Sequence, residues 1–305
     1  EPFGGLEELC LSPDGTRIAY SCRKKDGKDY AFSTDTEIYI YNIQSGECVH
    51  VPMGGGYDTA PVWSPDGRMI CWISMERNGY EADKQRLMLA DVDGMKVRNI
   101  RELSAGFKYN VAEPVWDEDS QHIWFNALTE GLQALYVTDL KGNITRKTGE
   151  GLWYDFTTPF FIDRTDGREI LYTTWQSMDF PTEIVAFNTA TQTGTKVTDE
   201  NGHILSQLKE HRTEARMVKT VDGKDMLTWV LYPPEFDQSK KWPAIEICLG
   251  GPQGTLSQGW SYRWNYRLMC SQGYVVVLPN RRGTTAFGQE WCEQISGDYC
   301  GLNIQ

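Results

Sequence analysis

Two adjacent glycines that follow an apolar stretch are the residues of this chain best suited to do chemistry. Residues 249–254 read LGGPQG and come directly after a predicted strand over 244–249. Adjacent glycines let the main chain turn sharply and leave backbone N–H groups uncovered by side chains. Such N–H groups can bind the negatively charged oxygen that forms during acyl transfer. We expect Gly250 and Gly251 to form an oxyanion-binding loop, with the N–H near Gly251 as donor; the alternative is a tight loop without catalytic role.

The other groups that acyl transfer requires do not accompany this loop. Hydrolases of this chemistry carry the reactive serine in a Gly-x-Ser-x-Gly turn between a strand and a helix. The nearest run, GTLSQG at 254–259, has a different spacing, and the four histidines are scattered. The eight cysteines show neither a C-x-x-C pair nor the spacing of metal ligands. We therefore expect none of the catalytic triad within these residues, no metal site and no cofactor.

The composition of the chain excludes two classes of partner. The net charge of -12 over 305 residues argues against nucleic acid, which requires a basic surface. No stretch reaches the roughly 18 uninterrupted apolar residues of a membrane helix. The first residues, EPFGG, show neither the basic start nor the apolar run of a secretory signal. We expect no nucleic-acid partner and no membrane span, whereas the residues leave open the compartment and a homo-oligomer.

A repeated strand–turn–strand unit occupies about the first 200 residues. The letters SPDG occur at 12–15 and 64–67, and weaker copies occur at 117–120 and 163–167. In a complete copy proline presets φ, aspartate bonds its own backbone, and glycine takes the left-handed position. A second pair of alternating segments follows each copy, and four strands per unit at this spacing are typical of propeller blades. We therefore predict a β-propeller of four blade-like repeats. The alternative is a two-sheet sandwich, which would not repeat the same turn at the same place in each unit.

The pattern changes near residue 200 and predicts a second domain. We expect a partial propeller over 1–203 and a different domain over 204–305. The latter contains a hairpin turn at Asp222-Gly223, a strand ended by Pro233-Pro234, the strand over 244–249 and a helix over 261–271. A continuous apolar strand at 274–278 then predicts the buried middle of a sheet that is covered on both faces. This order of elements indicates the N-terminal part of an α/β-hydrolase domain.

Three motifs in the second region carry a resemblance to a known family. They read GGPQG at 250–254, SYRWN at 261–265 and PNRRG at 279–283. In this order and spacing, the chain resembles the prolyl oligopeptidase family of serine peptidases, and within it the bacterial dipeptidyl-peptidase and acylaminoacyl-peptidase branch. The resemblance is strong from about residue 209 onward and weak in the repeats. It implies that the four repeats are part of a larger propeller and that the hydrolase domain is truncated before its nucleophile. A self-closed propeller of four blades is the alternative.

The resemblance assigns roles to the glycine loop. Gly250 and Gly251 match the paired oxyanion glycines of the family. Leu249 stands where relatives commonly carry His, Gln or Tyr, and leucine has no hydrogen to donate. The resemblance therefore implies an oxyanion hole that relies on backbone donors alone.

Two further pairs of residues match the family less closely. Arg281 and Arg282 correspond to an Arg-Gly element beside the active site, where they either contact substrate or, as we expect, brace the propeller against the hydrolase domain. Dipeptidyl peptidases often bind the amino terminus of a substrate with a Glu pair on the propeller, which makes Glu7 and Glu8 candidates. The alternative, which we prefer, is that Glu7 and Glu8 are an ordinary pair of strand residues pointing to opposite faces.

Two functions fit these observations. The first is part of a serine exopeptidase that resembles dipeptidyl peptidases and cleaves short peptides through an acyl-enzyme; the resemblance suggests a periplasmic or secreted enzyme. The second is a non-catalytic, TolB-like propeller that binds a partner. The region after residue 209 favours the peptidase, because a binding propeller has no use for half of a hydrolase domain. Without the triad, residues 1–305 alone are expected to be inactive.

Overall fold

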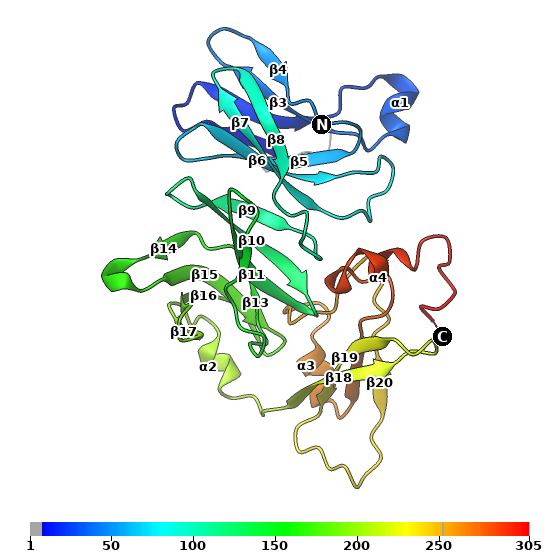
Figure 1. Ribbon diagram of the computed structural model, residues 1–305. Helices are drawn as coiled ribbons and strands as arrows, with labels where there is room; N and C mark the ends of the chain where they lie inside the picture. Colours follow the sequence, from blue (N-terminus) through cyan, green and yellow to red (C-terminus); the bar gives the residue numbers. More distant parts are fainter. Residues whose placement is uncertain (1–7, 252, 305) are drawn as a thin grey trace. The chain divides into compact units, whose positions relative to one another are not determined.

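The computed structural model describes residues 8–251 and 253–304, and the strands in these residues form five sheets (Figure 1). The chain divides into two compact units. One holds the residues up to 127 together with 135–147, and the other holds 128–134 together with 148–305. The division predicted at residue 203 stays a prediction.

Three sheets of four strands follow one another at the start of the chain, each with its strands in sequence order. The first joins β1 (Leu9–Leu11), β2 (Arg17–Cys22), β3 (Glu37–Asn42) and β4 (Cys48–His50), with α1 (Gly27–Phe32) between β2 and β3. The second joins β5 (Tyr57–Trp63), β6 (Met69–Met75), β7 (Arg86–Asp93) and β8 (Lys96–Glu102). The third joins β9 (Ala112–Trp116), β10 (His122–Thr129), β11 (Leu132–Asp139) and β12 (Ile144–Arg146). This is the blade pattern that the repeats predict.

The repeated turns link the first and second strands of these sheets, as expected. In the first copy the N–H of Gly15 donates to the carbonyl of Ser12 at 2.8 Å, and the Ser12 hydroxyl donates to Asp14 Oδ1 at 2.6 Å. The copy at 64–67 repeats both bonds. Gly15 has a φ of 70°, which glycine adopts without strain. In the weaker copy at 117–120, Ser120 occupies the position of this glycine, with a φ of 54°.

The first two sheets bury one apolar core between them. Its members come from both sheets and include two tryptophans of the second sheet, and all of them are buried. Dense packing of this kind fixes neighbouring sheets against each other. The cluster consists of Ala19, Ile38, Ile40, Val51, Trp63, Ile70, Trp72, Met88, Ala90 and Val92.

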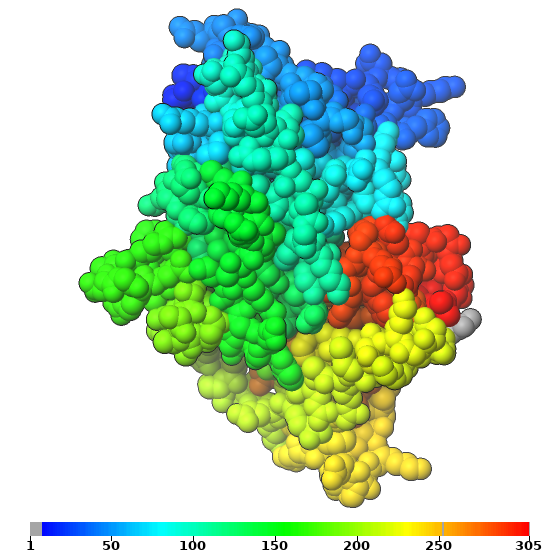
Figure 2. Space-filling view, in the orientation of Figure 1, coloured from blue at the N-terminus to red at the C-terminus, as the bar shows by residue number. Residues whose placement is uncertain are grey.

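The fourth sheet differs from the four-stranded expectation, because its first strand is divided in two. Both β13 (Asp155–Phe156) and β14 (Phe161–Asp163) pair with β15 (Ile170–Ser177), and β16 (Phe180–Asn188) and β17 (Thr193–Lys196) complete the sheet. Pro159 lies between the two short strands and has no N–H to donate to a ladder. The turn between β14 and β15, which contains the 3-10 helix η2 (Thr165–Gly167), projects from the surface (Figure 2).

The last sheet is mixed and has the order β18-β19-β21-β20. β18 (Arg212–Lys219), β19 (Asp225–Tyr232) and β21 (Val275–Pro279) are antiparallel neighbours, whereas β20 (Ala244–Glu246) runs parallel to β21. The helices of this region are α2 (Gly202–Leu205), α3 (Tyr266–Ser271) and α4 (Gln289–Glu293), with the 3-10 helix η3 (Thr285–Phe287) before α4. This arrangement matches the start of an α/β-hydrolase sheet. The loop between β19 and β20 projects from the surface (Figure 2).

The helix predicted over 261–271 begins only at Tyr266. Asn265 has an extended backbone, and its side chain accepts the N–H of Leu268 at 2.8 Å. An asparagine in this position caps a helix and fixes its first residue. The residues before it, 261–264, therefore belong to the loop that follows the glycines.

The second unit has a core that joins the mixed sheet to the strands of the propeller region. Leu132 of β11 and Met178, which follows β15, pack in one cluster with residues of β19, β21 and α3. The cluster consists of Leu132, Met178, Leu227, Trp229, Leu231, Leu256, Cys270, Val276 and Leu278. The fourth sheet and the mixed sheet thus share apolar packing within one unit.

Candidate functional site

The two glycines of the predicted oxyanion loop differ in what their positions tolerate. Gly251 has a φ of 137°, and a Cβ there would lie 2.8 Å from the nitrogen of Gln253 and 2.9 Å from that of Gly254. At Gly250 a Cβ would meet nothing within 4 Å. Position 251 thus requires glycine, and main-chain nitrogens converge beside it. The donor role of both residues stays a prediction.

Arg281 fixes the residue that precedes the glycines. Its Nη2 donates to the carbonyl of Leu249 at 2.6 Å, and its Nη1 donates to the carbonyl of Arg282 at 2.7 Å. Charge-assisted bonds of this kind are stronger than neutral ones. Arg281 therefore holds the entry to the loop from the end of β21.

Arg282 is a buried structural residue. It is 2 % exposed, and its guanidinium donates to Asp222 and to Gln294 and lies 4.8 Å from the ring centre of Trp291. The Asp222 pKa is lowered, first by a hydrogen bond from the Thr220 hydroxyl and then by the charge of Arg282. These partners all lie within 204–305, so the contacts of Arg282 that the structure describes stabilise the predicted hydrolase region internally. A contact of either arginine with substrate stays a prediction.

Asn280 holds the far side of the loop, a role that the sequence analysis did not predict. Its side chain is fully buried; Oδ1 accepts the N–H of Leu256 at 2.9 Å and Nδ2 donates to the Leu256 carbonyl at 3.0 Å. The indole N–H of Trp229 donates to the same carbonyl at 3.0 Å. The signal was present in the motif PNRRG, because a polar amide directly after a buried strand needs partners.

Two side chains of the fourth sheet bind the loop residues that follow Leu256. Asp155 accepts the Ser257 hydroxyl at 2.5 Å and the N–H of Gln133 at 2.9 Å. Gln176 accepts the N–H of Trp260 at 3.1 Å. Burial raises the pKa of the Asp155 carboxyl, against the effect of its hydrogen bonds. The loop over 249–260 is thus held from both the mixed sheet and the fourth sheet.

The predicted Glu pair lies only partly within the described residues. Glu7 falls outside them. Glu8 accepts the hydroxyl of Thr59 at 2.7 Å within the first unit. A role in binding an amino terminus stays a prediction for both.

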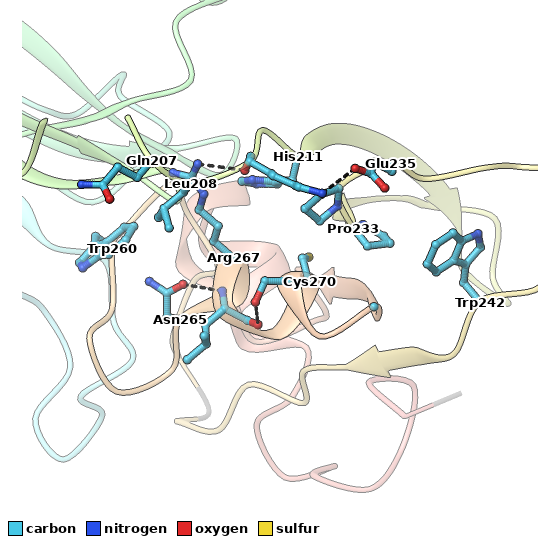
Figure 3. Close-up of a pocket in the computed structure, with 15 residues that line it drawn as sticks. Gln207, Leu208, His211, Pro233, Glu235, Trp242, Trp260, Asn265, Arg267 and Cys270 are labelled. Atoms are coloured by element: carbon cyan, nitrogen blue, oxygen red, sulfur yellow. Dashed lines mark hydrogen bonds and ion pairs between the residues drawn. The ribbon is translucent and has the colours of Figure 1, made fainter. Parts of the chain in front are cut away.

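A pocket of about 460 Å³ lies beside the end of the loop (Figure 3). Arg267 of α3 reaches across it, and its guanidinium donates to the carbonyls of Asp179 and Lys209 at 2.9 and 3.2 Å. His211 pairs with the Asp179 carboxylate at 3.0 Å. The walls are largely apolar, which is typical of small-molecule sites. The lining includes Leu208, Pro233, Pro234, Trp242, Trp260 and Leu268.

Two kinds of site are absent from the part of the chain that the structure describes. Within residues 8–251 and 253–304, no three His, Cys, Asp or Glu side chains gather in a way that could hold a metal ion. In the same residues no helix has the length and hydropathy to cross a membrane.

The sequence of this chain is similar to one family model and to several curated proteins. Residues 260–303 match the model of the prolyl oligopeptidase family. Dipeptidyl-peptidase 5 of Porphyromonas gingivalis is 44% identical over 306 residues, which cover 100% of this chain and 43% of that protein. Dipeptidyl-peptidase 5 of Aspergillus fumigatus is 27% identical, covering 98% of this chain and 42% of the relative. The chain therefore spans less than half the length of these curated relatives.

A solved structure shows the fold. Oligopeptidase B from Trypanosoma brucei superposes with a TM-score of 0.61 at 12% identity, covering 94% of this chain and 40% of that one. The predicted architecture, propeller blades followed by the first part of an α/β-hydrolase domain, is confirmed. Together, the match over 260–303 and the 44% identity along the whole chain confirm the resemblance to the prolyl oligopeptidase family that the sequence motifs predict.

Proposed function

We propose that these residues are part of a serine exopeptidase of the dipeptidyl-peptidase type. The observation that carries the proposal is the 44% identity to a dipeptidyl-peptidase 5 along the entire chain. It extends through the glycine loop, whose ends the arginine and asparagine after β21 hold in place. The substrates would be short peptides with a free amino terminus.

The part of the reaction assigned to these residues is stabilisation of charge. A serine attacks the scissile carbonyl, and a histidine takes the proton of its hydroxyl. The histidine gives this proton to the amine that leaves as the C–N bond breaks, and water then hydrolyses the acyl-enzyme. Backbone N–H groups at Gly250 and Gly251 bind the oxygen that becomes negative in each step. The 305 residues contain no Gly-x-Ser-x-Gly turn, so the proposal assigns the nucleophile to another part of the protein. Residues 1–305 alone are then inactive.

The test compares full-length protein with residues 1–305 on three substrates. These are a dipeptide joined to a chromophore, the same dipeptide with an acetylated amino terminus, and a longer peptide with an internal fluorescence quencher. We expect the full-length protein to cleave the first fastest and residues 1–305 to cleave none. Preference for the acetylated substrate indicates an acylaminoacyl peptidase instead, and cleavage inside the long peptide indicates an endopeptidase.

A fluorophosphonate probe tests the location of the nucleophile, because it labels activated serines. We expect labelling of the full-length protein and none of residues 1–305. Stoichiometric labelling of residues 1–305 would place the nucleophile within them. Absence of hydrolysis and of labelling in the full-length protein would favour a binding propeller.

Two further properties are proposed, one from the family resemblance and one from the change of sequence pattern near residue 200. We propose that the parent protein is periplasmic or secreted, and fractionation of cells that express it tests this. We also propose domains over 1–203 and 204–305, with the second incomplete, which limited proteolysis of the full-length protein tests.

A further inference from the structure

We propose that Asp155 is a positioning residue for the oxyanion loop, acting through Ser257 from the fourth sheet. The proposal rests on the proposed function, because it concerns how the same loop is held for catalysis. Asp155 itself does not contact the glycines. Its contact is with Ser257, six residues after Gly251 in the same loop.

The first observation is that Asp155 is buried and that both of its carboxylate oxygens accept hydrogen bonds. The residue is 5 % exposed. Its Oδ1 accepts the N–H of Gln133 at 2.9 Å, and its Oδ2 accepts the Ser257 hydroxyl at 2.5 Å. A buried carboxylate is costly unless hydrogen bonds satisfy it. Here those bonds tie the tip of the β10–β11 hairpin and the oxyanion loop to one side chain.

The second observation is the strand register beneath this contact. Asp155 of β13 and Gln176 of β15 are cross-strand partners, so their side chains leave the same face of the sheet. Asp155 binds Ser257, and Gln176 accepts the N–H of Trp260 at 3.1 Å. One pair of neighbouring residues thus holds two points of the loop three positions apart. Two loop contacts from one cross-strand pair are not expected if either contact arose by chance.

The third observation is that the remaining ends of the loop are fixed elsewhere. Arg281 holds the Leu249 carbonyl, and Asn280 with Trp229 holds Leu256. Gly251 lies between these anchors, in a conformation that a side chain would not allow. An oxyanion donor must sit within a fraction of an ångström of its working position. The Asp155 contact adds an anchor on the other side of Leu256, so the loop is fixed by the propeller sheet as well as by the mixed sheet.

The test is Asp155→Asn in the full-length protein. The substitution keeps the size of the side chain but places an NH2 group or a weaker acceptor toward the Ser257 hydroxyl. We expect kcat to fall up to about 100-fold, the effect of misplacing a catalytic group by roughly 1 Å. KM should change little, because the donor is aimed at the transition state. Ser257→Ala should give a similar loss, and the double variant should lose little more than either single variant.

The matched control is Asp163→Asn, in β14 of the same sheet. Its carboxylate accepts only from Thr165 among its described bonds, outside the loop. Activity should stay at the wild-type level. If Asp155→Asn leaves kcat unchanged, or lowers it only in proportion to the unfolded fraction, the proposal is wrong.

A measurement without activity separates this proposal from the proposed function. In the full-length protein, amide hydrogen exchange over 249–260 should speed up in Asp155→Asn and not in Asp163→Asn, while β6 keeps its protection. Wild-type full-length protein without peptidase activity would contradict the proposed function and leave this result standing. Unchanged exchange over 249–260 would contradict the positioning role.

Discussion

The Asn280 side chain binds both main-chain polar atoms of Leu256, one at 2.9 Å and the other at 3.0 Å. An amide can do this because it carries an acceptor and a donor side by side. The pairing resembles a rung of a β-ladder, formed here by a side chain and not by a neighbouring main chain. It fixes the loop to the end of β21 without regular secondary structure.

Asn280→Ala removes both bonds and leaves the Leu256 N–H buried without this partner. We expect a loss of about 1–3 kcal/mol in the free energy of unfolding, the usual cost of an unsatisfied buried group. Urea unfolding of residues 1–305, followed by tryptophan fluorescence, measures it. Gln272→Ala, which truncates an exposed amide in the same unit, is the control and should change stability by less than about 0.5 kcal/mol. Equal effects of the two would show that the Asn280 clamp is not important.

Gly251→Ala and Gly250→Ala should separate in stability. The first forces a Cβ against two main-chain nitrogens at a φ of 137°, and the second places it in open space. Strained backbone of this kind costs about 1–3 kcal/mol, so residues 1–305 should lose stability or local protection only with Gly251→Ala. Thermal unfolding and amide exchange over 249–260 provide the measurement.

In the full-length protein Gly251→Ala should also lower turnover by about 100- to 1000-fold, the effect of losing one oxyanion donor. Leu249→Ala is the comparison, because its side chain packs against the core and offers no hydrogen bond. We expect it to lower the melting temperature with little specific loss of turnover. Modest and equal losses from both would mean that the loop is only structural.

Removing Asp222 should destabilise the chain more than removing Arg282. The Arg282 side chain is 2% exposed and that of Asp222 is 35% exposed. Asp222→Ala leaves a buried guanidinium short of a partner, whereas after Arg282→Met water can reach the remaining carboxylate. The melting temperatures of the two variants give the order. A lower melting temperature for Arg282→Met would show that the stacking on Trp291 matters more than the charge pair.

His211 should make stability depend on pH. Burial lowers its pKa, the Asp179 carboxylate opposes this, and the charge of Arg267 lowers the pKa further. The unfolded chain therefore takes up a proton first as the pH falls below about 6.5, and stability is lost from there down to the folded pKa. Lys209 and Glu235, which pair with each other, line the same pocket as His211.

The variant His211→Gln should remove this contribution. We expect the wild type to lose unfolding free energy relative to the variant as the pH falls below about 6.5, and the difference should level off once the pH passes the lowered pKa of the folded state. Urea unfolding at several pH values measures it. A wild type that gains stability over this range relative to the variant would show that the Asp179 charge dominates instead.

The features that sequence predicted well are those with local causes. The turn at 12–15 is fixed by the residue types within it, so its hydrogen bonds follow from four consecutive residues alone. The start of α3 was predicted less well. The sequence pattern placed it at residue 261, but the Asn265 cap makes the helix begin at Tyr266. In the fourth sheet, Pro159 divided a strand that alternation alone would have continued.

Only part of the candidate site has a local signal in the sequence, for the same reason. The glycine loop and the arginines carry their signal in short motifs. The Asp155–Ser257 contact joins residues 102 positions apart, in a two-residue strand without periodicity. Nothing local distinguishes this aspartate from others, and only the strand register brings it to the loop.

The shared core of the second unit bears on how such proteins exchange parts during evolution. Leu132 and Met178 belong to propeller strands or their turns, yet they pack with Trp229 and Val276 of the mixed sheet. A gene fusion that joined a foreign propeller to this sheet would bring unmatched side chains to both places. Recombination should therefore preserve residues 128–134 and 148–305 as an inherited set, and these two propeller positions should vary together with the mixed sheet across descendants.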